Sequence, residues 1–164
     1  MGGAKISYKL HNQLDFFNKN TDKIKNSKII SLKAKNKKNK YDAGVSLSNL
    51  ADILSKSYNL KVTKIHAEKN DNKSIKNFRK HVKKHLKDGD HFILVNYNGK
   101  ILESKTGGHI SPLAAYDEVT DSILIMDVAT HKGLWFFTPL EKLYKAMNSK
   151  DGENYRGYLV VSKK

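Results

Sequence analysis

The stretch GGHISPLAAYDEVTDSILIMD, residues 107–127, decides the fold of the second half of the chain. Two runs of strand-forming residues, 110–117 and 122–129, are separated by the short segment EVTD. This pattern predicts an antiparallel hairpin of two strands of about equal length. Such a hairpin would return Asp127, on the second run, to the neighbourhood of His109, just before the first.

His109 and Asp127 are therefore candidate catalytic residues. Asp127 follows the apolar run SILIM, where a carboxylate is costly unless it is paired. An aspartate beside a histidine holds one imidazole tautomer and stabilises the imidazolium. Gly107 and Gly108 would let a ligand approach the backbone closely, which makes Gly108 a candidate substrate-binding residue. Spacing alone leaves an alternative open, in which Asp127 bonds a turn and His109 is buried by chance.

The elements upstream of the hairpin follow from hydrophobic periodicity. Apolar residues at helical spacing predict a helix within 44–60, capped by Ser46, and a second within 74–90. Alternation of apolar and polar residues predicts a strand at 60–68. The apolar run at 91–97 predicts a buried central strand.

The two ends of the chain complete the predicted fold. A short helix is expected at 5–19. Thr138 is expected to cap a helix with Pro139 at its first position, and a strand at 156–163 closes the chain. The prediction is a single α+β domain over residues 1–164, with helices dominating the first half and an antiparallel sheet the second.

Composition narrows the function. The chain has no cysteine, which excludes disulfides, thiolate metal ligands and a thiol nucleophile within it. Its net charge of +15 comes almost entirely from lysine, and this argues against nucleic-acid recognition, which relies on arginine. No apolar run approaches the ~20 residues of a membrane span, so no membrane partner is expected. Residues 1–11 are expected to be a tag or poorly ordered, and 33–43 an exposed basic loop.

The motif GGHISPLAAYD…SILIMDVA resembles the phytochelatin synthase family, in particular its bacterial members. The similarity extends to HFILVNY, VSLSNLADIL and NQLDFFNK upstream and to LEKLYKAMN and RGYLVVS downstream, and so covers residues 12–162. The family consists of papain-like cysteine transferases that act on glutathione in heavy-metal detoxification. The resemblance therefore implies a papain-like α+β fold, of which the N-terminal part is expected to be missing.

The resemblance also implies a Cys–His–Asp triad, in which His109 and Asp127 fill the histidine and aspartate positions. The thiolate would attack the carbonyl before the glycine of glutathione, and His109, oriented by Asp127, would protonate the departing glycine. The γ-glutamylcysteinyl thioester would then pass to a second glutathione or to water, and both outcomes stay open. No cofactor and no metal site is expected in this chain.

The sequence departs from the family pattern in two places. The family's cysteine, with a glutamine before it, lies upstream of the Phe–Phe segment, where this chain has neither. After the aspartate the family has Val-Ala-Arg, whereas Thr130 stands here in the arginine position. Asp151 matches the family's substrate-binding aspartate, and either His131 or Lys132 would have to supply the missing positive charge. Alternatively, Asp151 is a turn-former in SKDGEN.

Three interpretations remain open. In the first, the chain is a piece of a glutathione γ-glutamylcysteinyltransferase or glutathione hydrolase, inactive alone and completed by a Cys-bearing N-terminal fragment. In the second, it is a cysteine-less module that binds glutathione-like γ-glutamyl peptides. In the third, it is a basic scaffold for nucleic acid. We also expect a homo-oligomer, because Leu47, Leu50 and Leu54 would lack a partner helix. The compartment stays open, because no signal segment is visible.

Overall fold

The computed structural model describes residues 21, 45–104, 107–127 and 135–164. The chain forms two compact units, Met1–Ala43 and Gly44–Lys164, and the account below concerns the second. The helix predicted at 5–19, the expected tag at 1–11 and the basic loop at 33–43 lie outside the described residues. The single domain over 1–164 stays a prediction.

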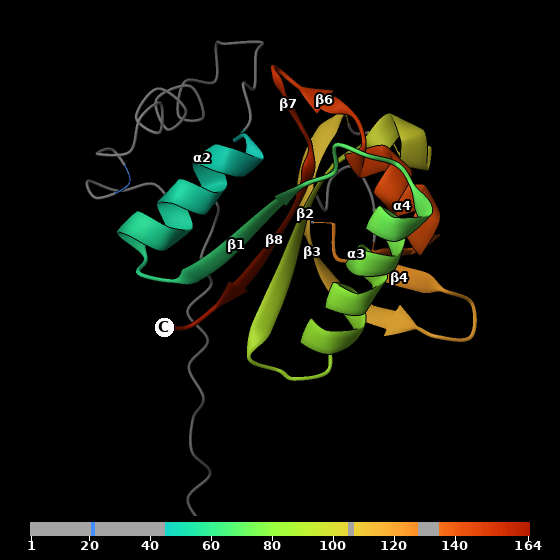
Figure 1. Cartoon of the computed structure of the whole chain (residues 1–164), viewed down its shortest axis with the longest axis horizontal. Helices are drawn as coiled ribbons and strands as arrows, with labels where there is room; N and C mark the ends of the chain where they lie inside the picture. Colours follow the sequence, from blue (N-terminus) through green and yellow to red (C-terminus); the bar gives the residue numbers. More distant parts are fainter. Residues whose placement is uncertain (1–20, 22–44, 105–106, 128–134) are drawn as a thin grey trace, which may run out of the picture. The chain divides into compact units, whose positions relative to one another are not determined.

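A six-stranded antiparallel sheet forms the centre of this unit, with strand order β1-β8-β2-β3-β4-β5 (Figure 1). Its strands are β1 Lys61–His66, β2 His91–Asn98, β3 Gly108–Asp117, β4 Ser122–Ile125, β5 Phe136–Pro139 and β8 Gly157–Ser162. The prediction of a buried central strand at 91–97 is confirmed, because β2 lies between β8 and β3. Two short strands, β6 Lys150–Asp151 and β7 Asn154–Tyr155, form a separate hairpin.

Helices connect the strands. They are α2 Leu47–Asp52, which continues as the π-helical turn η3 Ile53–Ser57, α3 Asn72–His85, the short 3-10 helix η4 Gly99–Leu102, and α4 Leu140–Met147. The predicted Ser46 cap is confirmed, since its hydroxyl accepts a hydrogen bond from the Asn49 amide at 3.2 Å. Asp71 caps α3 in the same way through the Ser74 amide, at 2.8 Å. Within the described part of the chain, no helix is both long and apolar enough to span a bilayer.

The start of α4 differs from the prediction. Thr138 was expected to cap this helix, but it is a buried residue of β5 and pairs with Ile123 of β4. Pro139 is the residue before the helix and gives it no side-chain cap, so α4 begins at Leu140. The strand pairing of Thr138 outweighs its local capping preference, because the residue is needed to complete β5.

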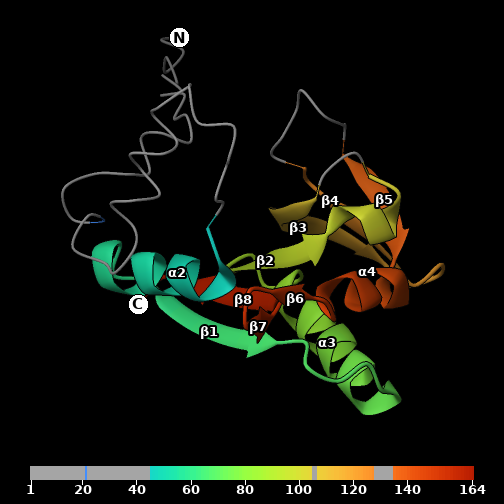
Figure 2. The ribbon, with the colours of Figure 1, turned by 90° about the horizontal axis from the view of Figure 1, so that it is seen from above.

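Helices cover both faces of the sheet (Figure 2). α2 lies on one face, over β1 and β8, and α3 and α4 lie on the other. Leu47 of α2 is 2% exposed and packs on Leu159 and Val161 of β8. The expectation that Leu47, Leu50 and Leu54 lack a partner is thus only half right: they have no partner helix there, but they pack on strands. Whether the protein self-associates stays a prediction.

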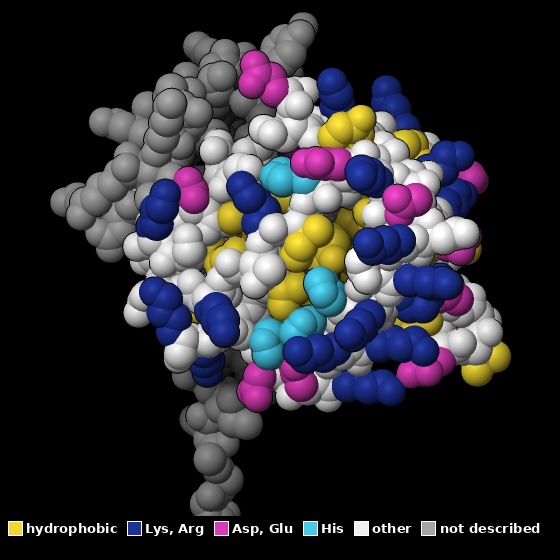
Figure 3. All heavy atoms as spheres, in the orientation of Figure 1, with side chains coloured by type: hydrophobic (Ala, Val, Ile, Leu, Met, Phe, Trp, Pro, Cys, Tyr) yellow, Lys and Arg dark blue, Asp and Glu magenta, His cyan; other side chains and the backbone are white. Residues whose placement is uncertain are grey.

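Charged side chains cover much of the surface in Figure 3, and lysine and arginine are the most numerous among them. Acidic side chains lie among the basic ones. Glu118, for example, accepts hydrogen bonds from both Lys83 and Lys87, each at 3.0 Å. The polar face of α3 is therefore a solvated surface that is partly neutralised by ion pairs, each worth little by itself.

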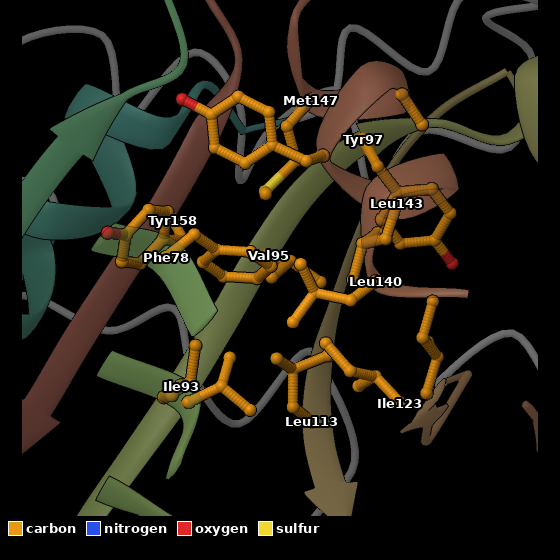
Figure 4. Packing of buried hydrophobic residues seen from close by; sticks show 14 of the residues in the cluster. Phe78, Ile93, Val95, Tyr97, Leu113, Ile123, Leu140, Leu143, Met147 and Tyr158 are labelled. Carbon is orange, nitrogen blue, oxygen red and sulfur yellow. The ribbon is translucent and has the colours of Figure 1, made fainter. Parts of the chain in front are cut away.

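The main core lies between the sheet and the α3–α4 layer (Figure 4). Its ring contacts centre on Phe78 of α3, which lies 4.8 Å from the Tyr158 ring and 5.7 Å from the Tyr144 ring, centroid to centroid. The largest side chains that are fully buried in this cluster are Tyr97, Phe78, Ile93, Ile123, Ile125, Leu140, Leu143, Met147, Val82 and Val95. This packing holds β2 and the β3–β4 hairpin in place, and these elements carry the candidate site.

The order of elements differs from the predicted division into halves. Helices and strands alternate along the described chain, since β1 and β2 come early and α4 comes late. The last strand, β8, inserts between β1 and β2. Its alternate residues face opposite layers: Tyr158 and Val160 pack in the main core, and Leu159 and Val161 pack under α2. The fold is α+β, as predicted.

Candidate active site

The hairpin predicted for residues 107–127 is present and joins His109 to Asp127. β3 and β4 pair from Asp117↔Ser122 to Leu113↔Ile125, with a β-bulge between Leu113 and Ala115. His109 is the second residue of β3, and Asp127 follows β4 by two residues. Across the open end of the hairpin, Nε2 of His109 lies 2.7 Å from Oδ1 of Asp127.

The pair is largely shielded from solvent. The Asp127 side chain is 2% exposed and that of His109 is 17% exposed. A buried carboxylate needs a partner, and the imidazole supplies one. Because Nε2 is committed to Asp127, any proton exchange with a reacting group falls to Nδ1, the other ring nitrogen. Asp127 thus fixes both the orientation and the tautomer of the ring.

Tyr97 forms the wall beneath this histidine. It lies opposite His109 in the β2–β3 register, and the two rings meet edge to face, 5.8 Å apart at 88°. The tyrosine is fully buried, and its hydroxyl lies 3.4 Å from the Ser111 hydroxyl. Burial raises the pKa of Tyr97 to about 12, so it stays a neutral phenol and acts as a packing surface.

A second polar cluster adjoins the pair. Nη1 of Arg156 donates to Oδ1 of Asn96 at 2.6 Å and lies 3.4 Å from Oδ2 of Asp151. Nδ2 of Asn96 donates to the same Asp151 oxygen at 2.9 Å. Asn96 is 1% exposed and the Arg156 side chain is 12% exposed, whereas the Asp151 side chain is 33% exposed. The cluster therefore places an anion at the surface beside a cation that is mostly buried.

Gly108 connects the two groups. A Cβ built on this residue would lie 2.7 Å from both Nη1 and Nη2 of Arg156, so any larger residue would collide with the guanidinium. Gly107, in contrast, has nothing within 4 Å of such an atom. The space that the sequence suggested for a ligand at Gly108 is taken by Arg156. The guanidinium lies against the residue that precedes His109.

Arg156 and Asn96 are the residues that sequence reasoning missed. The positive charge near Asp151 was expected from His131 or Lys132 in place of Thr130, and these three residues lie outside the described part of the chain. The structure pairs Asp151 with Arg156 instead. The available signal was composition, because a chain this rich in lysine places one of its two arginines here, and only arginine offers a planar fork of donors.

A third contact anchors the turn of the hairpin. Asp121, in the β3–β4 turn, has a positive φ of 50° and receives two hydrogen bonds from Arg79 of α3, at 2.9 and 2.7 Å. The Tyr116 hydroxyl donates to the same carboxylate at 2.6 Å. The Arg79 hydrogen bonds hold the pKa of Asp121 below its usual range. The turn is thereby tied to α3.

Known proteins were compared with the whole chain. A family described as phytochelatin synthase matches residues 5–158. Glutathione gamma-glutamylcysteinyltransferase 1 of Lotus japonicus is 32% identical over 122 residues, 73% of this chain and 24% of that protein. Glutathione gamma-glutamylcysteinyltransferase 3 of Lotus japonicus is 31% identical over 101 residues, and enzyme 2 of Arabidopsis thaliana is 31% identical over 102 residues.

These matches cover 60% and 61% of this chain, and 21% and 23% of the two relatives. The chain thus corresponds to a quarter or less of the length of the relatives it matches. The family match, however, takes in nearly all of the chain, including the hairpin that joins His109 to Asp127. The chain belongs to the phytochelatin synthase family.

Proposed function

We propose that this chain carries the acid–base and substrate-recognition part of a glutathione γ-glutamylcysteinyltransferase. The carrying observation is the buried contact of 2.7 Å between His109 Nε2 and Asp127 Oδ1, placed one residue from the Arg156 cluster. The chain has no cysteine, so the nucleophile of this proposal is a thiol from a Cys-bearing segment outside these 164 residues. A papain-like arrangement of the complete site is part of the proposal.

The first half-reaction follows from the direction of the imidazole. Nδ1 of His109 takes the proton of the thiol, and the thiolate attacks the carbonyl carbon of the cysteinyl residue in glutathione. The carbon–nitrogen bond to glycine breaks, and the imidazolium returns its proton to the departing glycine amine. Asp127 remains ionised and stabilises the imidazolium between these steps. The products are free glycine and a γ-glutamylcysteinyl thioester.

In the second half-reaction His109 acts as a general base toward the acceptor. It removes a proton from the amine of a second glutathione, which yields a longer peptide, or from water, which yields γ-glutamylcysteine. The thioester bond breaks and the thiol regains its proton from the imidazolium. Transfer and hydrolysis need the same residues of this chain, so access of water to the thioester decides between them.

The Arg156 cluster fits the γ-glutamyl end of the substrate. That end carries an α-ammonium and an α-carboxylate on one carbon, and the cluster offers an anion and a cation 3.4 Å apart. Asp151 would pair with the ammonium and the Arg156 fork with the carboxylate. Because such a pair recognises both charges at once, a peptide with an ordinary N-terminal residue and no free α-carboxylate would leave Arg156 without its partner.

A second candidate function is binding without turnover. It is favoured by the lack of cysteine together with the intact charge cluster. Both candidates predict that the chain alone binds glutathione and releases no glycine from it. Titration calorimetry of the chain with glutathione and with the cysteinylglycine dipeptide measures the γ-glutamyl contribution, which we expect to exceed 10-fold in affinity.

Complementation distinguishes the two candidates. Adding the N-terminal segment of a family relative, fused or as a separate chain, should produce glycine release from glutathione that is lost on His109→Asn. Glycine release by this chain alone would refute the proposed missing thiol. Release that survives His109→Asn would refute the acid–base role, and no release from a folded fusion that binds glutathione would favour the binding module.

A further inference from the structure

Three metal-binding side chains meet where α3 ends and β2 begins. His85 is the last residue of α3, Asp88 lies in the connecting loop, and His91 is the first residue of β2. One ligand atom from each residue lies within 4.8 Å of those of the other two. In Figure 3, histidine side chains are grouped beside acidic ones on the visible face.

The ligand atoms converge on a single carboxylate oxygen. Nδ1 of His91 lies 2.8 Å from Oδ2 of Asp88, and Nδ1 of His85 lies 3.6 Å from the same oxygen. The centroids of the two imidazole rings are 4.4 Å apart. Two rings and a carboxylate therefore share one small volume.

The fold leaves both imidazole nitrogens unsatisfied. Nδ1 of His85 and Nδ1 of His91 are buried, and neither has a hydrogen-bond partner of acceptable geometry. The 2.8 Å contact of His91 with Asp88 is short enough, but its direction does not suit the ring N–H. A buried polar atom without a partner costs about 1–3 kcal/mol, so this arrangement needs a stabilising group.

The loop holds the carboxylate in position. Oδ1 of Asp88 accepts hydrogen bonds from the backbone amides of Asp90 and His91, at 3.1 and 3.2 Å. Gly89 turns the chain with a φ of +69°, a conformation that other residues rarely adopt. The backbone thus uses one oxygen and directs the other toward the two rings, as second-shell contacts do for a metal ligand.

We propose that His85, Asp88 and His91 bind a divalent transition-metal ion, for which zinc is the best-suited probe. Two imidazole nitrogens and one carboxylate oxygen form a donor set that suits zinc and its neighbours in the series. Metal–ligand bonds of about 2.0–2.2 Å in a tetrahedral site separate the ligand atoms by about 3.4 Å. The 2.8 and 3.6 Å separations already approach this value.

The site has access for an ion and a place for water. The side chains of Asp88 and His91 are 33% and 30% exposed, so an ion can enter from solvent. Three protein ligands leave a fourth position for water. The sequence analysis expected no metal site, because these histidines lie in a lysine-rich segment that reads as solvated surface.

The ion would act as a structural staple. His91 begins β2 and Tyr97, beneath His109, lies near its end, so the ion would lie about 20 Å from the candidate active site at ~3.3 Å per strand residue. It would therefore take no part in the proposed reaction. By joining the last turn of α3 to the start of β2, it would stabilise the folded chain in proportion to its occupancy.

The test uses the full chain without an affinity tag, stripped with EDTA and dialysed. Cobalt(II) titration should show visible ligand-field bands that saturate at one ion per chain and disappear when zinc is added. Asp88→Asn keeps Oδ1 for the two amides but replaces the ligating oxygen by an NH2 group, and it should weaken binding by 10-fold or more. Asp90→Asn, a change of the same kind in the same loop, is the matched control and should bind like the wild type.

Two further measurements keep the outcome decisive. His85→Gln and His91→Gln should each abolish the cobalt bands, and zinc should raise the Tm of the wild type and Asp90→Asn but not of the ligand variants. Each variant is checked for folding by circular dichroism in EDTA. Equal cobalt or zinc binding by Asp88→Asn and Asp90→Asn, or bands that survive both histidine changes, would overturn the proposal.

Discussion

Replacing Gly108 with alanine tests whether Arg156 is held against the start of β3. The new Cβ would lie 2.7 Å from Nη1 and Nη2 and 3.0 Å from Cζ of Arg156. Ordinary carbon contacts begin at about 3.5 Å, so the guanidinium would have to retreat by about 0.8 Å. Its hydrogen bond to Asn96, at 2.6 Å, and its ion pair with Asp151, at 3.4 Å, cannot both survive such a shift.

Two opposing effects set the size of the loss. A hydrogen bond that involves a charged group contributes about 1.5–3 kcal/mol to stability. Alanine also restricts the unfolded chain more than glycine does, which offsets about 0.4–1 kcal/mol where the backbone tolerates it. We therefore expect the free energy of unfolding to fall by about 1–2 kcal/mol, a decrease in Tm of roughly 4–8 °C.

Urea unfolding of a double-mutant cycle isolates the contact. Arg156→Met removes the guanidinium and keeps the length of the side chain, so Gly108→Ala in that background should be neutral or slightly stabilising. The coupling free energy between the two changes should be about 1–2 kcal/mol. If Gly108→Ala destabilises both backgrounds equally, glycine is required at this position for a reason other than Arg156.

The other predictions concern the hairpin and the proposed reaction. Arg79→Lys should lower the free energy of unfolding at pH 7 by about 0.5–1 kcal/mol, because a point charge replaces a two-pronged but partly exposed contact with Asp121; a change within the error of urea unfolding would count against the anchor. Since the pKa of Asp121 is lowered in the folded state, its stabilisation is complete above the usual carboxyl range near pH 4 and is lost as the pH falls through the lower folded value, so the wild type and Arg79→Lys should converge in acid titrations. Asp127→Asn in the Cys-complemented protein should reduce kcat on the order of 10³-fold and leave glutathione affinity unchanged in calorimetry; a parallel loss of affinity would indicate a structural role. Tyr97→Phe should cost under about 1 kcal/mol in thermal unfolding, because its hydroxyl contact at 3.4 Å is long, whereas Tyr97→Ala should cost about 3–5 kcal/mol; similar losses in both would mean that the hydroxyl, not the ring, matters.

Local sequence patterns predicted most individual elements but misjudged some of their partners. The caps, the central strand and the hairpin depend on neighbouring residues, and they are found where expected. Thr138 was misassigned because its capping pattern is local, whereas its place in β5 depends on pairing with β4. Gly108 was interpreted as space for a ligand, because nothing in the local sequence points to Arg156.

The sequence by itself determined the hairpin and the approach of His109 to Asp127. These residues are 18 positions apart on two adjacent strands, so one turn and a strand period of two are enough to place them. Only the tertiary structure decided the second cluster, in which Asn96 and Arg156 are separated by 60 positions. They meet because β8 inserts between β1 and β2, and that choice depends on burying both faces of β8 at once. Burial of this kind is a property of the packed layers, and no local pattern encodes which distant strand will provide the partner.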